Sequence, residues 1–426
     1  MSGGTSAAPP RLGVVADDYT GALDVGSVLR ERGHQVELRF GPPPPDARPA
    51  ADVVVVALKT RTAPREDAVG QSLGAATWLL DRGAVQLYLK YAATFENPAN
   101  IGPVLDALSD LAGADGRHPV LVCPAVPSYG RTVYQGHLFV GDRLVSEAPE
   151  GRHPLTPKDD PRLARLLAAA THRRVGLVPW EVVVEGAAAT AAALDELAGH
   201  GVGYAVADVL CDADLDTLGA AARGHRLVSG AAGLAGALLG RAGAGPPAAA
   251  PDEDLAGAVV AGSCSVQTQE QLRRFEAVRP VFRFVPTMVA AGRDVAGEAL
   301  AFARTHLPTG PVGIAATAPP EVVRREQAAL GVEVAAQLVE STLAAVAEGL
   351  VGAGVRRLVV AGGETSGAVV ARLGIARVSI EQAVAPGVAW VHASEALPRW
   401  VLLKSGPLGD PDLLLRALLA DRRAQR

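Results

Sequence analysis

Gly362-Gly363-Glu364-Thr365-Ser366-Gly367 follows an apolar run, Arg357 to Ala361, and leads into a second apolar stretch, Ala368 to Leu373. This order predicts a strand that passes into a helix through a glycine turn. Glycine lets the backbone approach an anion closely, and the first N–H groups of a helix point outward with the positive end of the helix dipole behind them. The turn is therefore a candidate phosphate site, with a plain tight turn as the alternative.

Three more segments have the same form. Gly262-Ser263-Cys264-Ser265 follows the apolar run Ala258 to Ala261, and Lys404-Ser405-Gly406 follows Trp400 to Leu403. Turns that follow parallel strands gather at the carboxyl edge of their sheet, where α/β proteins hold their ligands. We expect these two turns and the first to lie along one edge. The last, Ser229-Gly230-Ala231, either faces a ligand or packs a helix on a sheet.

Short apolar strands alternate with helices rich in alanine and leucine along all 426 residues. This alternation is typical of parallel sheets covered by helices, and the length fits two domains. We predict an α/β protein of two domains, each a mostly parallel sheet flanked by helices, with the active site in the interdomain cleft. The expected strands cover residues 12–16, 53–58, 85–90, 120–123, 176–178, 204–206, 226–228, 258–261, 280–285, 312–315, 358–361, 378–380 and 400–403.

Composition divides the chain further. Residues 1–10 are small and polar and are expected to form a disordered tail, and residues 243–254 are a run of Pro, Gly and Ala typical of a linker. An N-terminal domain is therefore expected over residues 11–242 and a C-terminal domain over residues 255–426.

The overall charge and the cysteines limit the class of protein. A formal net charge of −5 and a pI near 6.0 provide no basic field for nucleic acid or an anionic membrane. The three cysteines lie far apart without a C-x-x-C pair, which favours a reducing cytoplasm. The longest apolar candidate, around Leu227 to Leu239, is too short to span a bilayer. We predict a cytoplasmic protein with no nucleic-acid or membrane partner.

Two adjacent carboxylates, Asp17 and Asp18, follow the first strand. At the carboxyl end of a buried strand they are placed to bind a substrate hydroxyl, to accept its proton or to help hold a divalent ion. The alternative is that one of them only caps the helix that begins near Thr20.

Cations also follow strands of the first half. Arg61 and Arg131 stand beside hydroxyl residues and suit a bidentate contact with a carboxylate, although exposure on the surface is the commoner state of arginine. Lys90 ends another strand, and a buried lysine requires a partner, which favours a functional role.

His137 lies in a predicted hairpin, residues 133–143, that closes at Gly141-Asp142. No second His or Cys stands at ligand spacing around it, so His137 is interpreted as a hydrogen-bonding pocket residue or as a packed sheet residue.

Taken in order, these segments resemble the four-carbon acid sugar kinase family and, within it, the 3-oxo-tetronate kinase branch. The resemblance covers nearly everything from Arg11 to Leu419. Its marks are Ala16-Asp17-Asp18-Tyr19-Thr20-Gly21-Ala22, Cys123-Pro124-Ala125, Gly130-Arg131-Thr132-Val133-Tyr134, Gly136-His137-Leu138-Phe139-Val140, His153-Pro154-Leu155-Thr156-Pro157, Gly262-Ser263-Cys264-Ser265, the glycine turn at Gly362 and Lys404-Ser405-Gly406.

The resemblance implies a kinase that uses ATP and Mg²⁺ to phosphorylate the terminal hydroxyl of a four-carbon sugar acid, such as 3-oxo-tetronate, threonate or erythronate. It implies an N-terminal domain that binds the sugar acid and a C-terminal domain that binds the nucleotide. We expect Asp17 or Asp18 to be the catalytic base, the metal ligands being left open. The acid-sugar residues would be Arg61, Lys90, Asn100, Arg131 and His137, and the nucleotide residues Ser263, Ser265, Gly362, Gly363, Glu364, Thr365, Ser366, Lys404 and Gly406.

One segment departs from the family pattern. The branch usually has Tyr-Cys-Ser-Thr-Phe-Asp-Ser after the lysine, whereas Lys90 is followed by Tyr91-Ala92-Ala93-Thr94-Phe95-Glu96-Asn97. A hydroxyl is replaced by the methyl of Ala93, which would leave a substrate hydroxyl without a partner and alter selectivity if Ala93 faces the ligand.

Two other classes fit parts of the pattern. A nicotinamide-dependent hydroxy-acid dehydrogenase also uses glycine turns, but the chain has no convincing G-x-G-x-x-G followed by an acid some 20 residues on. A non-catalytic sugar-acid-binding protein would retain the acid-sugar site and lose turnover. The sequence leaves the oligomeric state open, although a homodimer would be ordinary.

Overall fold

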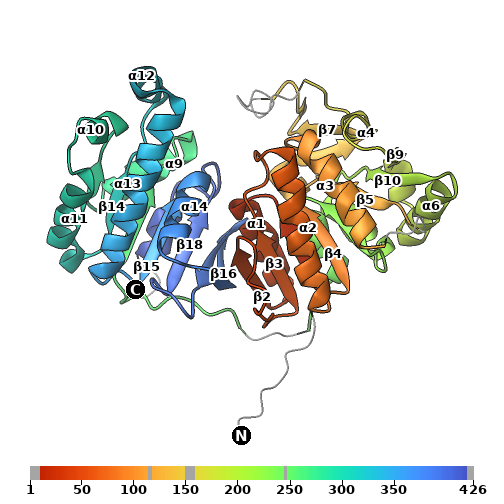
Figure 1. Cartoon of the computed structure of the whole chain (residues 1–426), viewed down its shortest axis with the longest axis horizontal. Helices are drawn as coiled ribbons and strands as arrows, with labels where there is room; N and C mark the ends of the chain where they lie inside the picture. The colour runs from red at the N-terminus through yellow and green to blue at the C-terminus, as the bar shows by residue number, and fades with distance from the viewer. Residues whose placement is uncertain (1–9, 114–117, 149–158, 244–246, 420–426) are drawn as a thin grey trace, which may run out of the picture. The chain divides into compact units, whose positions relative to one another are not determined.

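The computed structural model describes residues 10–113, 118–148, 159–243 and 247–419. The motif His153-Pro154-Leu155-Thr156-Pro157, residues 1–9 of the expected tail and residues 244–246 of the expected linker lie outside the described residues. The chain divides into two compact units, Met1–Gly245 and Pro246–Arg426 (Figure 1).

Unit 1 is built on a parallel sheet whose inner strands, rich in Val, Leu and Ala, are buried on both faces, whereas the edge strand Arg174–Val178 is mostly half-buried. Every neighbouring pair among these strands is parallel. The strand order is β2 (Val36–Phe40), β3 (Val53–Ala57), β1 (Leu12–Ala16), β4 (Gln86–Lys90), β11 (Leu227–Gly230), β5 (Val120–Cys123), β10 (Val202–Ala207) and β9 (Arg174–Val178).

Two rows of helices cover this sheet. Figure 1 shows α2 and α3 in front of the strands, and the second row packs against the other face. The first row is α2 (Arg65–Asp81), α3 (Pro98–Leu111) and α4 (Leu163–Ala168), and the second is α1 (Tyr19–Glu31), α8 (Ala232–Leu239), α7 (Asp212–Ala221) and α6 (Ala187–Gly199), with the short α5 (Trp180–Val183) against α6 and α7.

Strand β1 is the point at which the order of the sheet reverses. The chain runs from β1 to β2 and β3 on one side and then crosses through α2 to β4 on the other side. In open α/β sheets such a switch point opens a crevice at the carboxyl ends of the strands. The residues directly after β1, β3 and β4 therefore meet there.

A small antiparallel sheet stands beside this edge, formed by β6 (Arg131–Tyr134), β7 (His137–Val140) and β8 (Arg143–Leu144). Val140 pairs with Arg143, so the predicted hairpin closure at Gly141-Asp142 is confirmed. The β6–β7 turn uses Gln135 (φ 50°) and Gly136 (φ 69°), and the carboxylate of Asp208 accepts both of their N–H groups, at 2.7 and 2.9 Å.

Unit 2 is also built on a mostly parallel sheet, with one antiparallel edge. The parallel strands are β13 (Val281–Arg283), β14 (Val312–Ala315), β12 (Gly257–Ala261), β15 (Arg357–Ala361) and β18 (Trp400–Lys404), in that order, followed by the antiparallel β17 (Val388–His392) and β16 (Arg377–Ala385). The predicted α/β class, with mostly parallel sheets flanked by helices, is confirmed in both units.

The helices of unit 2 form two layers and a projecting pair. Helices α11 (Val295–His306), α13 (Val332–Gly352) and α14 (Gly363–Arg372) pack on one face, and α9 (Val266–Glu276) and α15 (Leu413–Leu418) pack on the other (Figure 1). Helices α10 (Pro286–Ala290) and α12 (Pro320–Leu330) pack against α13.

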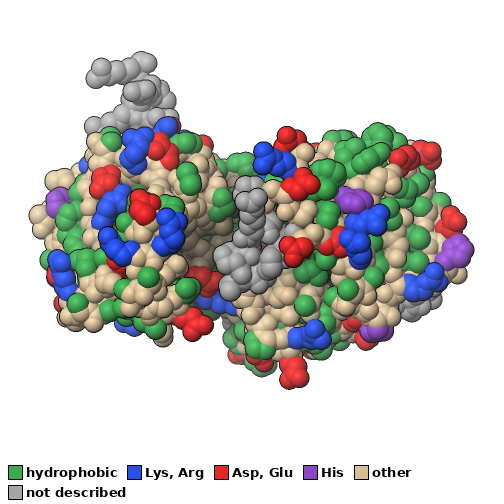
Figure 2. Space-filling view, turned by 90° about the horizontal axis from the view of Figure 1, so that it is seen from above, with side chains coloured by type: hydrophobic (Ala, Val, Ile, Leu, Met, Phe, Trp, Pro, Cys, Tyr) green, Lys and Arg blue, Asp and Glu red, His purple; other side chains and the backbone are tan. Residues whose placement is uncertain are grey.

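Helix α13 is the one described helix long and apolar enough to cross a bilayer by length and composition, with a mean hydropathy of 1.4. The expectation that the longest apolar segment lies around Leu227 to Leu239 is therefore wrong, because α13 is longer. Because α13 packs against α10, α11, α12 and α14, we interpret it as a helix of the domain core. Figure 2 shows acidic and basic side chains interspersed on the visible face of both units. The cytoplasmic location of the protein stays a prediction.

Candidate active site

Asp17, Asp18 and Arg61 form an ion-pair cluster at the switch point of unit 1. The Arg61 guanidinium donates from Nε and Nη2 to the two oxygens of Asp17, at 3.0 and 2.8 Å, and from Nη2 to Asp18 Oδ1 at 2.6 Å. The third nitrogen, Nη1, lies 3.9 Å from Glu96 Oε2. All three nitrogens of the guanidinium therefore lie near carboxylates of the protein itself.

The two aspartates differ in environment. Asp18 is the N-cap of α1: it accepts the N–H of Gly21 at 2.9 Å and the hydroxyl of Thr20 at 2.6 Å. Burial would raise the pKa of Asp18, but Arg61, Lys90 and the capping hydrogen bonds outweigh burial and hold it below the ordinary value. For Asp17, burial prevails over Arg61 and raises the pKa. Capping thus explains Asp18 and leaves Asp17 without a local structural role.

The loop that carries Arg61 is held by two asparagines. Asn100 Nδ2 donates to the carbonyls of Thr60 at 3.1 Å and Ala63 at 2.9 Å, and Asn97 Nδ2 donates to the carbonyl of Arg61 at 2.6 Å. Asn97 has φ 54°, a conformation that asparagine tolerates better than most residues. Asn100, expected among the acid-sugar residues, lies against the backbone of this loop.

Lys90 is buried, with 2% of its surface exposed, and donates from Nζ to the carbonyl of Tyr91 at 2.9 Å. A Cβ added at Gly21 would lie 2.9 Å from this ammonium, so α1 passes directly over it. The charge of Lys90 acts on Asp18 and on Asp24 of the same helix. Asp24 also accepts the hydroxyl of Tyr129 at 3.0 Å.

Arg131 and His137 lie on the small antiparallel sheet rather than in the Asp17 cluster. Arg131 Nη1 donates to the carbonyl of Tyr129. His137 Nδ1 lies 2.8 Å from the carbonyl of Gln135, and its Nε2 accepts the Arg162 Nε–H at 3.1 Å, which fixes Nδ1 as the donor. His137 is therefore a hydrogen-bonded sheet residue in this structure.

The segment that departs from the family pattern has a tightly determined backbone. Phe95 (φ 52°) is buried and stacks edge-on against Tyr91, with ring centroids 5.4 Å apart. Thr94 donates to Glu96 Oε1 at 2.9 Å, and the extra methylene of Glu96 brings its carboxylate towards Arg61. A cavity of ≈ 20 Å³ lies beside Asp17, enough for about one water molecule and too small for a sugar acid.

Ser229, in the remaining glycine turn of unit 1, is fully buried. Its hydroxyl donates to the carbonyl of Leu121 at 3.2 Å, and a Cβ added at Gly230 would overlap the carbonyl of Cys123. This turn packs a helix closely on the sheet.

In unit 2 the three glycine and serine turns are brought together by backbone hydrogen bonds. The N–H groups of Gly262 and Ser263 donate to the carbonyl of Ala361, and the N–H of Gly362 donates to the carbonyl of Lys404. A Cβ added at Gly262 would overlap Thr365 Oγ1, and one added at Gly406 would overlap Ser263 Oγ. A side chain at either position would have to displace a neighbouring hydroxyl, which shows how closely the turns approach.

Lys404 ends β18 beneath these turns and is completely buried. Its ammonium donates to Thr268 Oγ1 at 3.0 Å and to the carbonyl of Gly406 at 2.9 Å, both neutral acceptors. Among the described residues, no carboxylate lies within ion-pair distance of Lys404. Burial lowers the pKa of Lys404 to about 7.

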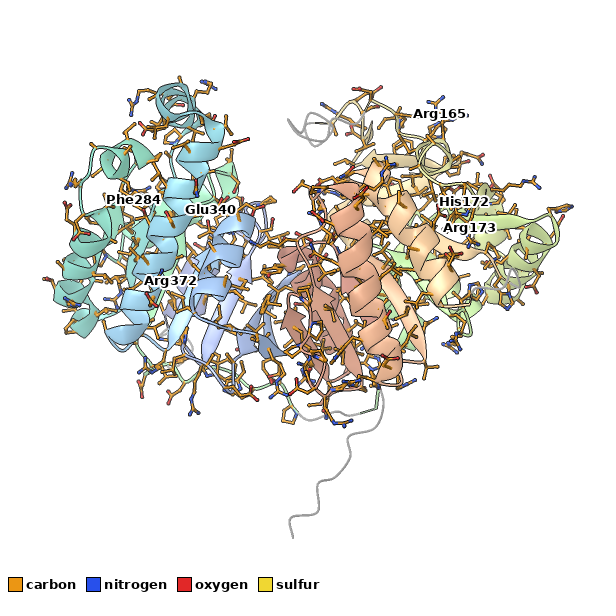
Figure 3. The ribbon with its side chains drawn as sticks, viewed as in Figure 1. Arg165, His172, Arg173, Phe284, Glu340 and Arg372 are labelled. Atoms are coloured by element: carbon orange, nitrogen blue, oxygen red, sulfur yellow. The ribbon has the colours of Figure 1, made fainter. Side chains whose placement is uncertain are left out.

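A pocket of ≈ 340 Å³ opens beside the first two turns. One part of its lining is polar and comes from the turns and the start of α14, where Gly362 is the N-cap and Ser366 Oγ donates to its carbonyl. The other part is apolar and comes from α10, α12, α13 and the loop that follows β14. Figure 3 labels Glu340, which lines the pocket from α13. The apolar lining is Val285, Pro286, Ala316, Ala318, Val323, Val332, Ala335, Ala336 and Val339.

These features fit a nucleotide. Turns that exclude a Cβ, the start of a helix and a buried cation without a protein anion suit phosphates, and the apolar part suits a base. No cluster of three or more His, Cys, Asp or Glu side chains that could hold a metal occurs among the described residues. Mg²⁺ commonly arrives with phosphates and needs only one or two carboxylates, and Glu364, exposed on the pocket lining, is the carboxylate at the glycine turn.

Sequence reasoning missed several of these residues. Thr268 and Thr317 support the turns through hydroxyls, Thr317 donating to the carbonyl of Ser263 at 2.8 Å. A serine followed three residues later by threonine at a helix start, Ser265 and Thr268, is the signal that could have identified one of them. Glu326, buried at the pocket wall, had no local signal.

A two-unit α/β chain with a carboxylate cluster at the switch point of one unit, and in the other a pocket whose lining suits a nucleotide, has the features of a small-molecule kinase. Family models described as "Sugar-binding N-terminal domain" and "Nucleotide-binding C-terminal domain" match residues 12–238 and 258–414. The chain belongs to the four-carbon acid sugar kinase family, in the branch whose curated members are named 3-oxo-tetronate kinase. It is a phosphotransferase with an alcohol group as acceptor. The alternative class, a nicotinamide-dependent dehydrogenase, is therefore wrong.

Relatives match over nearly the whole chain. The 3-oxo-tetronate kinase of Burkholderia multivorans is 45% identical over 97% of this chain and 98% of its own length, and that of Methylobacterium radiotolerans is 46% identical over 96% and 98%. The crystal structure of Haemophilus influenzae protein HI1011 is 36% identical, with a TM-score of 0.80 over 95% of this chain and 98% of that chain. These names support a kinase for a four-carbon sugar acid, and the nucleotide-binding domain implies the use of ATP.

We expect Arg61→Gln to destabilise unit 1 by about 3 kcal/mol at pH 7, because it removes the cation that contacts both the buried Asp17 and the half-buried Asp18 and leaves Lys90 as the remaining cation beside them. Without the guanidinium the folded-state pKa of Asp17, which burial already raises, rises further above the unfolded value. The folded state then binds more protons, so the loss of stability shrinks as pH falls from 7 to 5. Urea unfolding at both pH values measures this, with the exposed Arg65→Gln as control. An equal loss at both pH values would contradict the cluster.

Proposed function

We propose that the chain is an ATP-dependent kinase that phosphorylates the terminal (C4) hydroxyl of a four-carbon sugar acid such as 3-oxo-tetronate, threonate or erythronate. The observation that carries the proposal is Lys404, a buried cation with neutral partners, placed under three turns that exclude side chains. A buried ammonium is costly unless an anion compensates it. The phosphates of ATP are the anion that a kinase supplies.

On the acid-sugar side, Arg131 is the better candidate to bind the substrate carboxylate. Arg61 already donates to the buried Asp17 and the half-buried Asp18, and releasing it would leave Lys90 as the remaining cation beside both carboxylates. Arg131 lies at the start of β6, where its Nη1 donates to the carbonyl of Tyr129. Lys90 then balances the acidic residues of α1 rather than the substrate.

Asp17 is the better candidate for the catalytic base. Its raised pKa favours proton acceptance, and Arg61 holds both of its oxygens in a fixed orientation at the end of β1. Asp18 is committed to the start of α1. In phosphoryl transfer the protein chiefly aligns the reactants, so Asp17 would orient the hydroxyl and take its proton late in the reaction.

The nucleotide side has a matching division of roles. The N–H groups at the start of α14 would bind phosphate oxygens, and Lys404 would neutralise part of their charge through the Gly406 turn. Mg²⁺ would neutralise charge on the transferring phosphate, with Glu364 as the candidate carboxylate. An active site in the interdomain cleft and a homodimer both stay predictions.

We expect Mg²⁺-dependent ADP release in a screen of 3-oxo-tetronates, threonates and erythronates, with one acid clearly preferred. Four-carbon polyols that lack the carboxylate, such as threitol, should not support turnover, because they leave the cationic side of the site unpaired. A coupled ADP assay measures this. Calorimetric binding of an acid with no ADP release would instead support the non-catalytic binding protein.

We expect Asp17→Asn to lower kcat by about 10² to 10⁴-fold, the range for loss of a general base. Asp18→Asn should retain kcat within about tenfold, because asparagine is also a good N-cap. Steady-state kinetics with the preferred acid measure both variants. If both turn over at wild-type rates, neither aspartate is the base.

We expect the affinity for a nonhydrolysable ATP analogue to fall as pH rises from 7.5 to 9, by up to about tenfold per pH unit. The sign follows from Lys404: with a pKa of about 7 in the free protein its amine is mostly neutral at these pH values, and a bound polyanion favours the charged form, so binding takes up a proton. Lys404→Met should bind more weakly and lose this dependence, whereas the exposed Lys59→Met should retain it. Calorimetry in two buffers measures the proton uptake; an unchanged affinity in the wild type would refute this role.

A further inference from the structure

Helix α12 is held to unit 2 in an unusual way. Its buried residue is a glutamate, Glu326, which is 5% exposed, while the rest of its surface is exposed or half-buried. A surface helix ordinarily buries an apolar stripe. Val322, Val323 and Leu330 of α12 are half-buried, so its one fully buried contact is a polar one.

That contact is made with α10. Glu326 Oε2 accepts the N–H of Thr287 at 3.0 Å and the hydroxyl of Thr287 at 2.6 Å. Burial would raise the pKa of Glu326, but these hydrogen bonds and Arg325 hold it below the ordinary value, so the carboxylate is charged at neutral pH. Hydrogen bonds to a charged acceptor are about twice as strong as neutral ones.

Residues of the same two helices line the pocket. Val285 and Pro286 line it from the start of α10, and Val323, Glu326 and Gln327 line it from α12. At its C-terminal end α12 joins α13 through one residue, Gly331. The φ of Gly331 is 82°, a backbone conformation that would be strained in a residue with a side chain. The position of α12 beside the pocket is therefore fixed at two points: by Gly331 at its C-terminal end and by the contact of Glu326 with Thr287 near its middle.

We propose that Glu326 and Thr287 are positioning residues that hold α12 against α10 and so enclose the nucleoside part of the bound nucleotide. The proposal rests on the proposed function and deepens it by assigning the base and ribose to the apolar part of the pocket. Glu326 acts through α12, and its contact with Thr287 predicts an effect on nucleotide binding that is separate from binding of the sugar acid.

The test compares Thr287→Val and Glu326→Gln with the control Glu321→Gln, which makes the same change at an exposed position of the same helix. Thr287→Val removes the shorter hydrogen bond and leaves the carboxylate in place. We expect it to raise the Kd for a nonhydrolysable ATP analogue and the KM for ATP by about tenfold, with the KM for the acid and kcat within about twofold. Glu326→Gln should have a smaller effect, because its amide oxygen still accepts, and Glu321→Gln should have none.

Amide hydrogen exchange of the wild-type protein gives a second readout that does not depend on the folding of variants. Residues 320–330 should exchange more slowly with the analogue bound. The inference is overturned if Thr287→Val binds the analogue as well as wild type, if the KM for the acid rises equally, or if exchange in α12 is unaffected by the analogue. A wild-type protein that binds no nucleotide would instead refute the proposed function itself.

Discussion

Both sites depend on the continuation of parallel-strand hydrogen bonding into the loops beyond the strands. In unit 1 the N–H of Asp17 donates to the carbonyl of Lys90, and the N–H groups of Thr60 and Arg61 donate to the carbonyl of Asp17. In unit 2 the N–H of Gly362 donates to the carbonyl of Lys404 in the same manner. Residues far apart in sequence are fixed as neighbours by this pairing, because each loop is in register with the end of the next strand.

The two sites balance charge in opposite ways. Around β1, four carboxylates (Asp17, Asp18, Asp24 and Glu96) surround the cations Arg61 and Lys90, so the protein supplies its own counter-charges. Beneath the turns of unit 2, Lys404 has neutral partners. A compensated cluster resists rearrangement, whereas an uncompensated cation favours the binding of an anion. This difference fits the proposed roles of the two sites. The ion-pair cluster of unit 1 would align the sugar acid, and the charge of Lys404 in unit 2 would attract the phosphates of the nucleotide.

Much of this could be predicted from sequence, because apolar strands followed by glycine or aspartate are local patterns. The predicted strands 12–16, 120–123 and 312–315 agree with β1, β5 and β14 to the residue. Strand β2 escaped prediction because two of its five residues are charged; Glu37 and Arg39 are buried as an ion pair at 2.5 Å, with further hydrogen bonds to the backbone of Ala50 and Arg48. Contacts such as Asn100 with the Arg61 loop, or Glu326 with Thr287, join segments 39 residues apart in each case, and no local pattern encodes them.

The joint at Gly331 has an implication for how this family can vary. Because α12 and α13 are joined by a single residue, no loop is present that could accommodate an insertion or deletion. Such a change would instead reorient the whole of α12 relative to α13. Differences between related enzymes in the shape of the pocket beside α12 and α13 are therefore expected to arise by exchange of side chains on these two helices. The number of residues between α12 and α13 should be the same wherever the pocket is retained.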